Sequence, residues 1–86
     1  MPEISRFQGI IIKMFARDHN LPHFHAFIGS HEALFDIKTG KIIEGDFPPN
    51  KQVLVVAWAL LRKKELMRNW SSLSAGMGFD KIEPLR

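Results

Sequence analysis

Apolar and polar residues alternate along the first half of the chain in a pattern that predicts β-strands. Residues 23–28 and 33–38 both alternate strictly, so each segment presents one apolar face and one mixed face. Residues 7–17 carry apolar side chains on both faces, which predicts an interior strand covered on both sides for part of its length. Residues 41–44 can return as a short fourth strand.

Short turn-forming segments separate these predicted strands. Residues 18–22 (DHNLP) contain a proline and several turn formers, residues 29–30 are Gly-Ser, and residues 39–40 are Thr-Gly. Connections this short can join antiparallel strands, whereas parallel strands need a longer crossover. We therefore expect an antiparallel meander of three to four strands over residues 1–45.

The pattern becomes helical after two adjacent prolines. Pro48 and Pro49 exclude a central strand but suit a first helical turn. Apolar residues then recur at helical spacing, which predicts one long helix over residues 49–70. The first half of this helix is apolar nearly all round, and its second half, RKKELMRN, is strongly polar. We expect the first half to be deeply buried or shared with a partner, and the second half to face solvent.

The chain as a whole predicts one α+β domain. At 86 residues it is too short to form two independent cores. The favoured architecture is an antiparallel β-meander of three to four strands packed against one long helix in the C-terminal half, with a short tail. Residues 1–45 form the sheet and its histidine-rich loop, residues 49–70 the helix, and residues 71–86 a linker and tail.

Composition narrows the functions that the chain can have. The chain contains no cysteine, which excludes disulfides, thiolate zinc sites and thiol nucleophiles. Its net charge of +3 permits nucleic-acid binding without strongly favouring it. The N-terminus lacks the basic and apolar regions of a signal peptide, and the longest strongly apolar run, residues 53–61, is too short for a bilayer. We expect a soluble cytoplasmic protein with no membrane partner.

Histidines gathered within residues 19–25 form the candidate functional site. His23 and His25 project to the same face of a strand with their Cα atoms roughly 7 Å apart, so two imidazoles can converge on one ion or substrate atom. Asp18 and His19, just across the proline turn, can supply a third group, and Arg17 adds a cation. The predicted catalytic residues are therefore Arg17, Asp18, His19, His23 and His25.

Three chemistries and one structural role fit this cluster. His23, His25 and Asp18 with water would form an open site for a divalent metal, zinc or iron(II). Without metal, one histidine acting as base and another as acid, with Arg17 or Lys13 steadying a phosphate, would suit RNA cleavage. A pocket of histidine, asparagine and phenylalanine would bind a ligand or nucleotide. Histidines at a strand edge also serve packing and turn hydrogen bonds alone.

Short motifs spread along the chain carry a family resemblance. They are Met1-Pro2-x-Ile4-Ser5, Phe7-x-Gly9-Ile10-x-Ile12, Asp18-His19-x-x-Pro22-His23-Phe24-His25-Ala26, Gly45-x-Phe47-Pro48 before a helix with Trp58, Glu65-Leu66, Asn69-Trp70 and Ile82-x-Pro84-Leu85. Together they resemble, over nearly the entire chain, the small bacterial family known as domain of unknown function 4160. One departure is Leu21, where family members more usually have a second proline.

The resemblance implies a small prokaryotic protein whose gene often lies beside another small gene, an arrangement similar to toxin–antitoxin modules. It implies no demonstrated activity, and it supports the position of the site more than its chemistry. Three hypotheses remain open: a toxin-like enzyme acting on RNA, a non-catalytic module that binds a small partner protein encoded nearby, and a metal-binding protein. An open sheet edge would also allow a homodimer.

Overall fold

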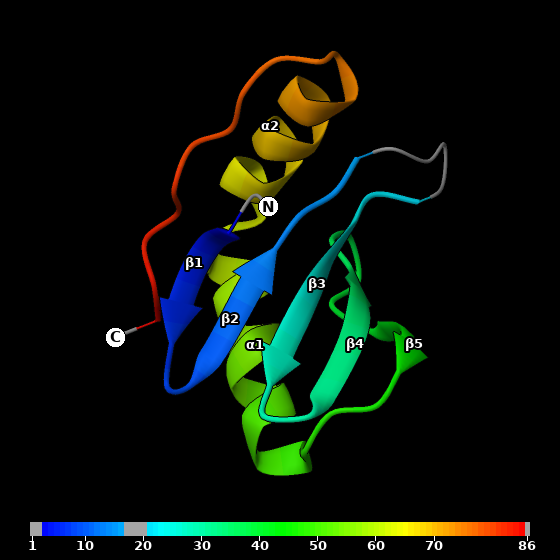
Figure 1. Ribbon diagram of the computed structural model, residues 1–86, viewed down its shortest axis with the longest axis vertical. Helices are drawn as coiled ribbons and strands as arrows, with labels where there is room; N and C mark the ends of the chain where they lie inside the picture. Colours follow the sequence, from blue (N-terminus) through cyan, green and yellow to red (C-terminus); the bar gives the residue numbers. More distant parts are fainter. Residues whose placement is uncertain (1–2, 17–20, 86) are drawn as a thin grey trace.

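The computed structural model describes residues 3–16 and 21–85 of the chain. Its elements are five strands followed by two helices: β1 (Glu3–Phe7), β2 (Ile10–Lys13), β3 (His23–Ile28), β4 (His31–Asp36), β5 (Ile42–Gly45), α1 (Pro49–Leu61) and α2 (Lys63–Ser74). The strands form one antiparallel sheet in the order β1-β2-β3-β4-β5, and Figure 1 shows α1 passing behind it. The expected α+β class and antiparallel meander are confirmed.

The expectation of three to four strands is wrong, because the N-terminal segment folds as a hairpin. The predicted strand over residues 7–17 contains β2 and, at Phe7, only the last residue of the separate strand β1. Gln8 and Gly9 connect the two with φ angles of 50° and 79°. Two consecutive positive φ values are typical of the tight hairpin turn that matches the twist of the flanking strands. Glutamine seldom adopts positive φ, so this dipeptide gives a weak turn signal.

The predicted single long helix is also corrected, since it divides into α1 and α2 at Arg62. The backbone of Arg62 has φ −110° and ψ 21°, outside the helical range. Two backbone hydrogen bonds involve the residue at the break. The Arg62 amide donates to the Trp58 carbonyl, and the Leu66 amide donates to the Arg62 carbonyl. The helical segment also extends to Ser74, beyond the predicted end at residue 70. No helix in the described ranges is long and apolar enough to cross a membrane.

The core lies between the sheet and the helices and is centred on Trp58. This side chain is fully buried, with its ring centroid 5.3 Å from that of Phe7 and 5.7 Å from that of Phe24. Phe24 in turn stacks on Phe35 at 5.4 Å. These contacts join β1, β3 and β4 to α1 through large apolar surfaces, whose removal from water is the main source of stability in a small domain.

The C-terminal tail is docked along β1. Ile82 is buried, and its amide donates a hydrogen bond to the carbonyl of Ile4. Asn69 of α2 is 3% exposed and contacts both backbone groups of Asp80: its Nδ2 donates to the carbonyl oxygen, and its Oδ1 accepts from the amide. A buried amide side chain satisfied in this way fixes the path of the tail.

The other face of the sheet carries no helix or strand of the described chain, as Figure 1 shows. Register places Lys13, His25 and Leu34 side by side across β2, β3 and β4. Their side chains are only partly buried, in contrast to the fully buried inner face. We call this surface the open face. It comprises Ile11, Lys13, Phe15, His25, Phe27, Glu32 and Leu34.

Gly45, at the end of β5, provides a test of how closely the last two strands approach. Its φ is 84°, and a Cβ atom there would meet the carbonyl oxygen of Glu32 and lie 3.1 Å from the Cα of Ala33. Gly45→Ala is therefore expected to lower the free energy of unfolding by about 3 kcal/mol through backbone strain and overpacking, as measured by urea denaturation. Gly29→Ala is the control: φ is 55° and nothing lies within 4 Å, so about 1 kcal/mol is expected. Equal losses would contradict the contact.

Candidate functional site

Two of the five predicted catalytic residues, His23 and His25, lie near each other on β3. Their ring centroids are 5.4 Å apart. The other three, Arg17, Asp18 and His19, lie outside the described residues. The structure therefore brings together the two strand histidines, as the alternation over residues 23–28 predicts.

His25 is oriented by a carboxylate from the neighbouring strand. Its Nδ1 lies 3.2 Å from Oε2 of Glu32, and the side chains are 17% and 50% exposed, respectively. The hairpin between β3 and β4 produces this contact, because Glu32 pairs with Phe27 and so lies diagonally across from His25. A carboxylate oxygen accepts hydrogen bonds, so with Glu32 ionised the Nδ1 of His25 donates to it, and in that tautomer a neutral ring has a lone pair on Nε2. That arrangement suits a general base.

Aromatic rings and one cation surround His25. The Phe15 ring meets the imidazole edge-on at 4.9 Å and 89°, and the Phe27 ring lies nearly parallel to it at 6.2 Å and 11°. The ammonium of Lys13 lies 5.1 Å from the centroid of the Phe27 ring. The centre of the open face therefore combines aromatic rings, a positive charge and a histidine that is hydrogen-bonded to a carboxylate.

His23 is placed differently from His25. It is 5% exposed, its Nδ1 donates to the Leu21 carbonyl at 2.8 Å, and its ring lies 5.1 Å from that of Trp70 in α2. These contacts attach the start of β3 to the helix layer. The predicted catalytic role of His23 stays a prediction, and its burial favours a role in positioning the strand that carries His25.

A hollow adjoins the open face beside His23. Its volume is about 250 Å³. The lining residues are Leu21, His23, Leu34, Ile43 and Glu44. Leu21 and Ile43 are 60% and 47% exposed, so the hollow is a largely apolar recess open to solvent. A flat aromatic or heterocyclic group could enter it from the open face.

Metal binding at the cluster stays a prediction. Within residues 3–16 and 21–85, no group of three or more histidine, cysteine, aspartate or glutamate side chains is close enough to hold a metal ion. His23 and His25 belong to that described part, whereas the third predicted ligand, Asp18, does not.

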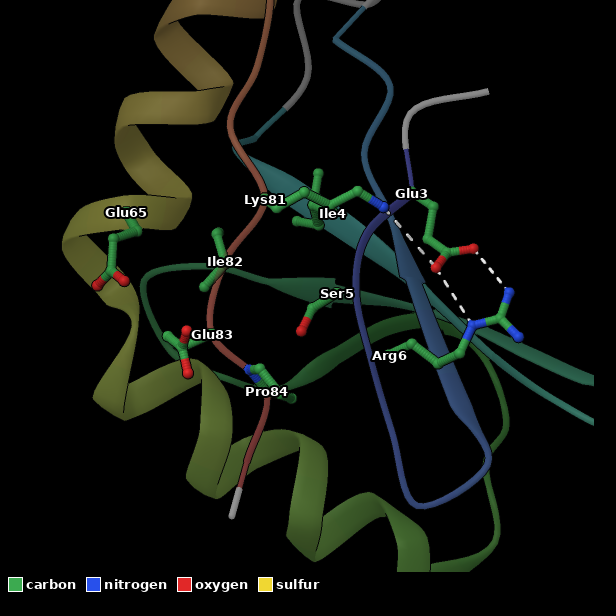
Figure 2. Close-up of a pocket in the computed structure, with 9 residues that line it drawn as sticks. All are labelled: Glu3, Ile4, Ser5, Arg6, Glu65, Lys81, Ile82, Glu83 and Pro84. Carbon is green, nitrogen blue, oxygen red and sulfur yellow. Dashed lines mark hydrogen bonds and ion pairs between the residues drawn. The ribbon is translucent and has the colours of Figure 1, made fainter.

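A second cleft, of about 390 Å³, lies between β1 and the docked tail and is drawn in Figure 2. The Arg6 guanidinium pairs with Glu3 at 2.8 Å, and the Lys81 ammonium lies 4.0 Å from the same carboxylate. The hydrogen bond from Arg6 lowers the pKa of Glu3 below its usual value. The Oγ of Ser5 is buried there without a hydrogen-bond partner in the described part of the chain. Because Arg6 and Lys81 both already lie against the carboxylate of Glu3, this cleft is better explained as the contact between tail and sheet than as a functional site.

Sequence reasoning missed Glu32 as a site residue. The predicted strand begins at residue 33, which leaves Glu32 in a turn, whereas β4 begins at His31. The Gly29-Ser30 dipeptide is the sequence signal that indicates this contact. A two-residue turn there pairs Ile28 with His31 and so places Glu32 on the same face of the sheet as His25. His31 itself is exposed.

These features define the class of protein: a small α+β domain whose five-stranded antiparallel sheet has helices on one face and a histidine-containing surface on the other. The chain belongs to the family described as Domain of unknown function (DUF4160), whose family model matches residues 9–71. This confirms the family resemblance found in the sequence, and the match includes the open face and α1. No curated protein and no solved structure matches the chain.

Proposed function

We propose that this protein binds single-stranded RNA on the open face and cleaves it, with His25 as general base, as the RNA-directed component of a two-gene module similar to toxin–antitoxin systems. The observation that carries the proposal is the imidazole of His25, which contacts the carboxylate of Glu32 and the rings of Phe15 and Phe27. The two-gene context rests on what the family resemblance implies.

The binding part of the proposal rests on stacking and charge. Proteins that bind single strands without a strict sequence preference combine a cationic surface with aromatic rings on which bases stack. The open face offers Phe15 and Phe27 as rings, with Lys13 beside Phe27. The adjoining recess at His23 is suited to a base that is splayed out of the strand. The formal charge of +3 agrees with a polyanionic partner.

The cleavage part rests on the contact between Nδ1 of His25 and Glu32, which leaves Nε2 on the far side of the ring to act as the base. Nε2 would accept the proton of a ribose 2′-hydroxyl, and the resulting oxygen would attack the adjacent phosphorus. The bond from phosphorus to the 5′ oxygen then breaks, which leaves a 2′,3′-cyclic phosphate on one product and a 5′-hydroxyl on the other. The departing oxygen takes its proton from water or from an acid, a role that the sequence leaves to another histidine of the cluster. The Lys13 ammonium lies 5.1 Å from the centroid of the Phe27 ring and would face the phosphate charge.

The test is an incubation of purified native protein with unstructured RNA, with and without a metal chelator, followed by analysis of the product ends. Cleavage with cyclic-phosphate ends in the presence of chelator is expected for the native protein and for His31→Asn, the matched control on the same hairpin. His25→Asn is expected to leave the RNA intact. Intact RNA with native protein over a range of pH would overturn the cleavage proposal, and so would equal activity of His25→Asn and His31→Asn.

A further inference from the structure

Helix α1 exposes a row of large apolar side chains on the side facing away from the sheet. Only Val55, Trp58 and Ala59 of this helix are buried. Val53 is 63% exposed, Leu60 is 60% and Leu61 is 68%. Exposed apolar residues scattered singly are ordinary on protein surfaces, whereas a contiguous patch marks an interaction site. We call this patch the α1 ridge, and it comprises Val53, Val56, Ala57, Leu60 and Leu61.

Two hollows flank Leu60 along the ridge. One, of about 520 Å³, is lined by Pro49, Gln52, Val53, Val56, Ala57 and Leu60. The other, of about 610 Å³, is lined by Leu60, Leu61, Lys63, Lys64, Glu65 and Met67. Alternating ridges and hollows of this kind fit the side chains of a second helix. A lipid surface needs no such hollows.

The charge around the ridge limits what can lie on it. Helix α1 contains no acidic residue. Lys63 and Lys64, the first residues of α2, are exposed just beyond the C-terminal end of α1, where they line the second hollow. Glu65 also lines this hollow, and its carboxylate forms an ion pair with the Arg62 guanidinium at 3.7 Å. A second copy of the chain would bring the same cations against this ridge, so charge complementarity favours a partner with acidic side chains.

We propose that the α1 ridge docks an amphipathic helix supplied by a different protein, with an apolar face for the two hollows and glutamate or aspartate along the flank that meets Lys63 and Lys64. This is the helix-in-groove mode of recognition, in which apolar anchors give affinity and flanking charges select the partner. The ridge belongs to the helix layer and the RNA site to the open face, so the two surfaces are separate and can be occupied together (Figure 1).

The experiment uses three fluorescent helical peptides that share one leucine-rich face and differ only in flanks of glutamate, glutamine or lysine. Binding to the full chain is followed by anisotropy. The glutamate peptide is expected to bind at least tenfold more tightly than the lysine peptide. Leu60→Ser is expected to weaken its binding by at least tenfold, the loss typical of a central apolar anchor. Lys63→Glu with Lys64→Glu is expected to reverse the order of the three peptides.

Controls separate this proposal from folding effects and from the RNA proposal. Met77→Ser removes a side chain that is 66% exposed outside the ridge, and it should leave peptide binding unchanged. His25→Asn should bind peptide normally, and Leu60→Ser should bind RNA normally. Equal affinity for the three peptides, or no effect of Leu60→Ser, would overturn the proposal. If sedimentation shows a dimer and Leu60→Ser dissociates it, the ridge binds a second copy of the chain instead. If the protein binds anionic vesicles and Leu60→Ser abolishes that binding, the ridge binds a membrane instead.

Discussion

The Trp58→Ala variant is expected to be largely unfolded under conditions in which the native protein is folded. Trp58 is fully buried and contacts Phe7 and Phe24, so its removal takes away the contact that joins the sheet to α1. Replacing a buried tryptophan with alanine costs about 3–5 kcal/mol. A domain of this size lies towards the lower end of the roughly 5–15 kcal/mol that stabilises folded proteins. Circular dichroism during urea denaturation measures the loss.

Trp58→Phe is the matched control for this variant. Phenylalanine keeps most of the ring packing but removes the indole N–H that donates to the Glu83 carbonyl at 2.8 Å. The expected loss is about 2 kcal/mol, partly from the smaller ring and partly from the missing hydrogen bond. This variant should remain folded with a tail more open to proteases. If Trp58→Ala and Trp58→Phe unfold at the same urea concentration, the central position of this ring in the core is contradicted.

The second large effect concerns the open face, where His25→Asn is expected to reduce RNA cleavage by about 10²–10⁴-fold. That range is the usual contribution of a general base. Glu32→Gln keeps an oxygen that can accept from Nδ1 but removes the carboxylate charge beside the ring. Its expected loss is smaller, roughly 10–100-fold in the cleavage step, as for other groups that orient a functional histidine. Single-turnover rates at saturating RNA measure both losses.

Phe27→Ala separates binding from chemistry on the same surface. The Phe27 ring lies beside His25 and below Lys13, so its removal takes away a stacking surface without removing the base. The expected result is a weaker affinity for RNA, by about 1–3 kcal/mol, with a smaller change in the cleavage rate of bound RNA. If Phe27→Ala and His25→Asn lower the rate for bound RNA equally, the assignment of separate roles fails.

The strand faces are predictable because an alternation of period two decides which side chains point to the core. Phe24 and Ala26 are fully buried and His25 is partly exposed, as the pattern over residues 23–28 predicts. The turn at Gln8 and the break at Arg62 are not predictable in the same way, because neither position has a residue type that favours its backbone geometry.

The candidate site is predictable in position and only partly in composition. The spacing of His23 and His25 places both rings together, and their 5.4 Å separation follows from it. The burial of His23 depends on Trp70, far along the chain in α2, and no local pattern reports such a contact. Glu32 joins His25 through strand register, which becomes visible only once the exact turn between β3 and β4 is known.

An NMR titration of isotope-labelled protein with an uncleavable single strand, a 2′-O-methyl oligonucleotide without secondary structure, tests the central claim most directly. The account predicts chemical-shift changes at Lys13, His25, Phe27 and Leu34 on the open face, and none at Val53 and Leu60 on the α1 ridge. Changes confined to the ridge, or no changes at RNA concentrations that saturate known single-strand binders, would contradict the assignment of the open face to RNA.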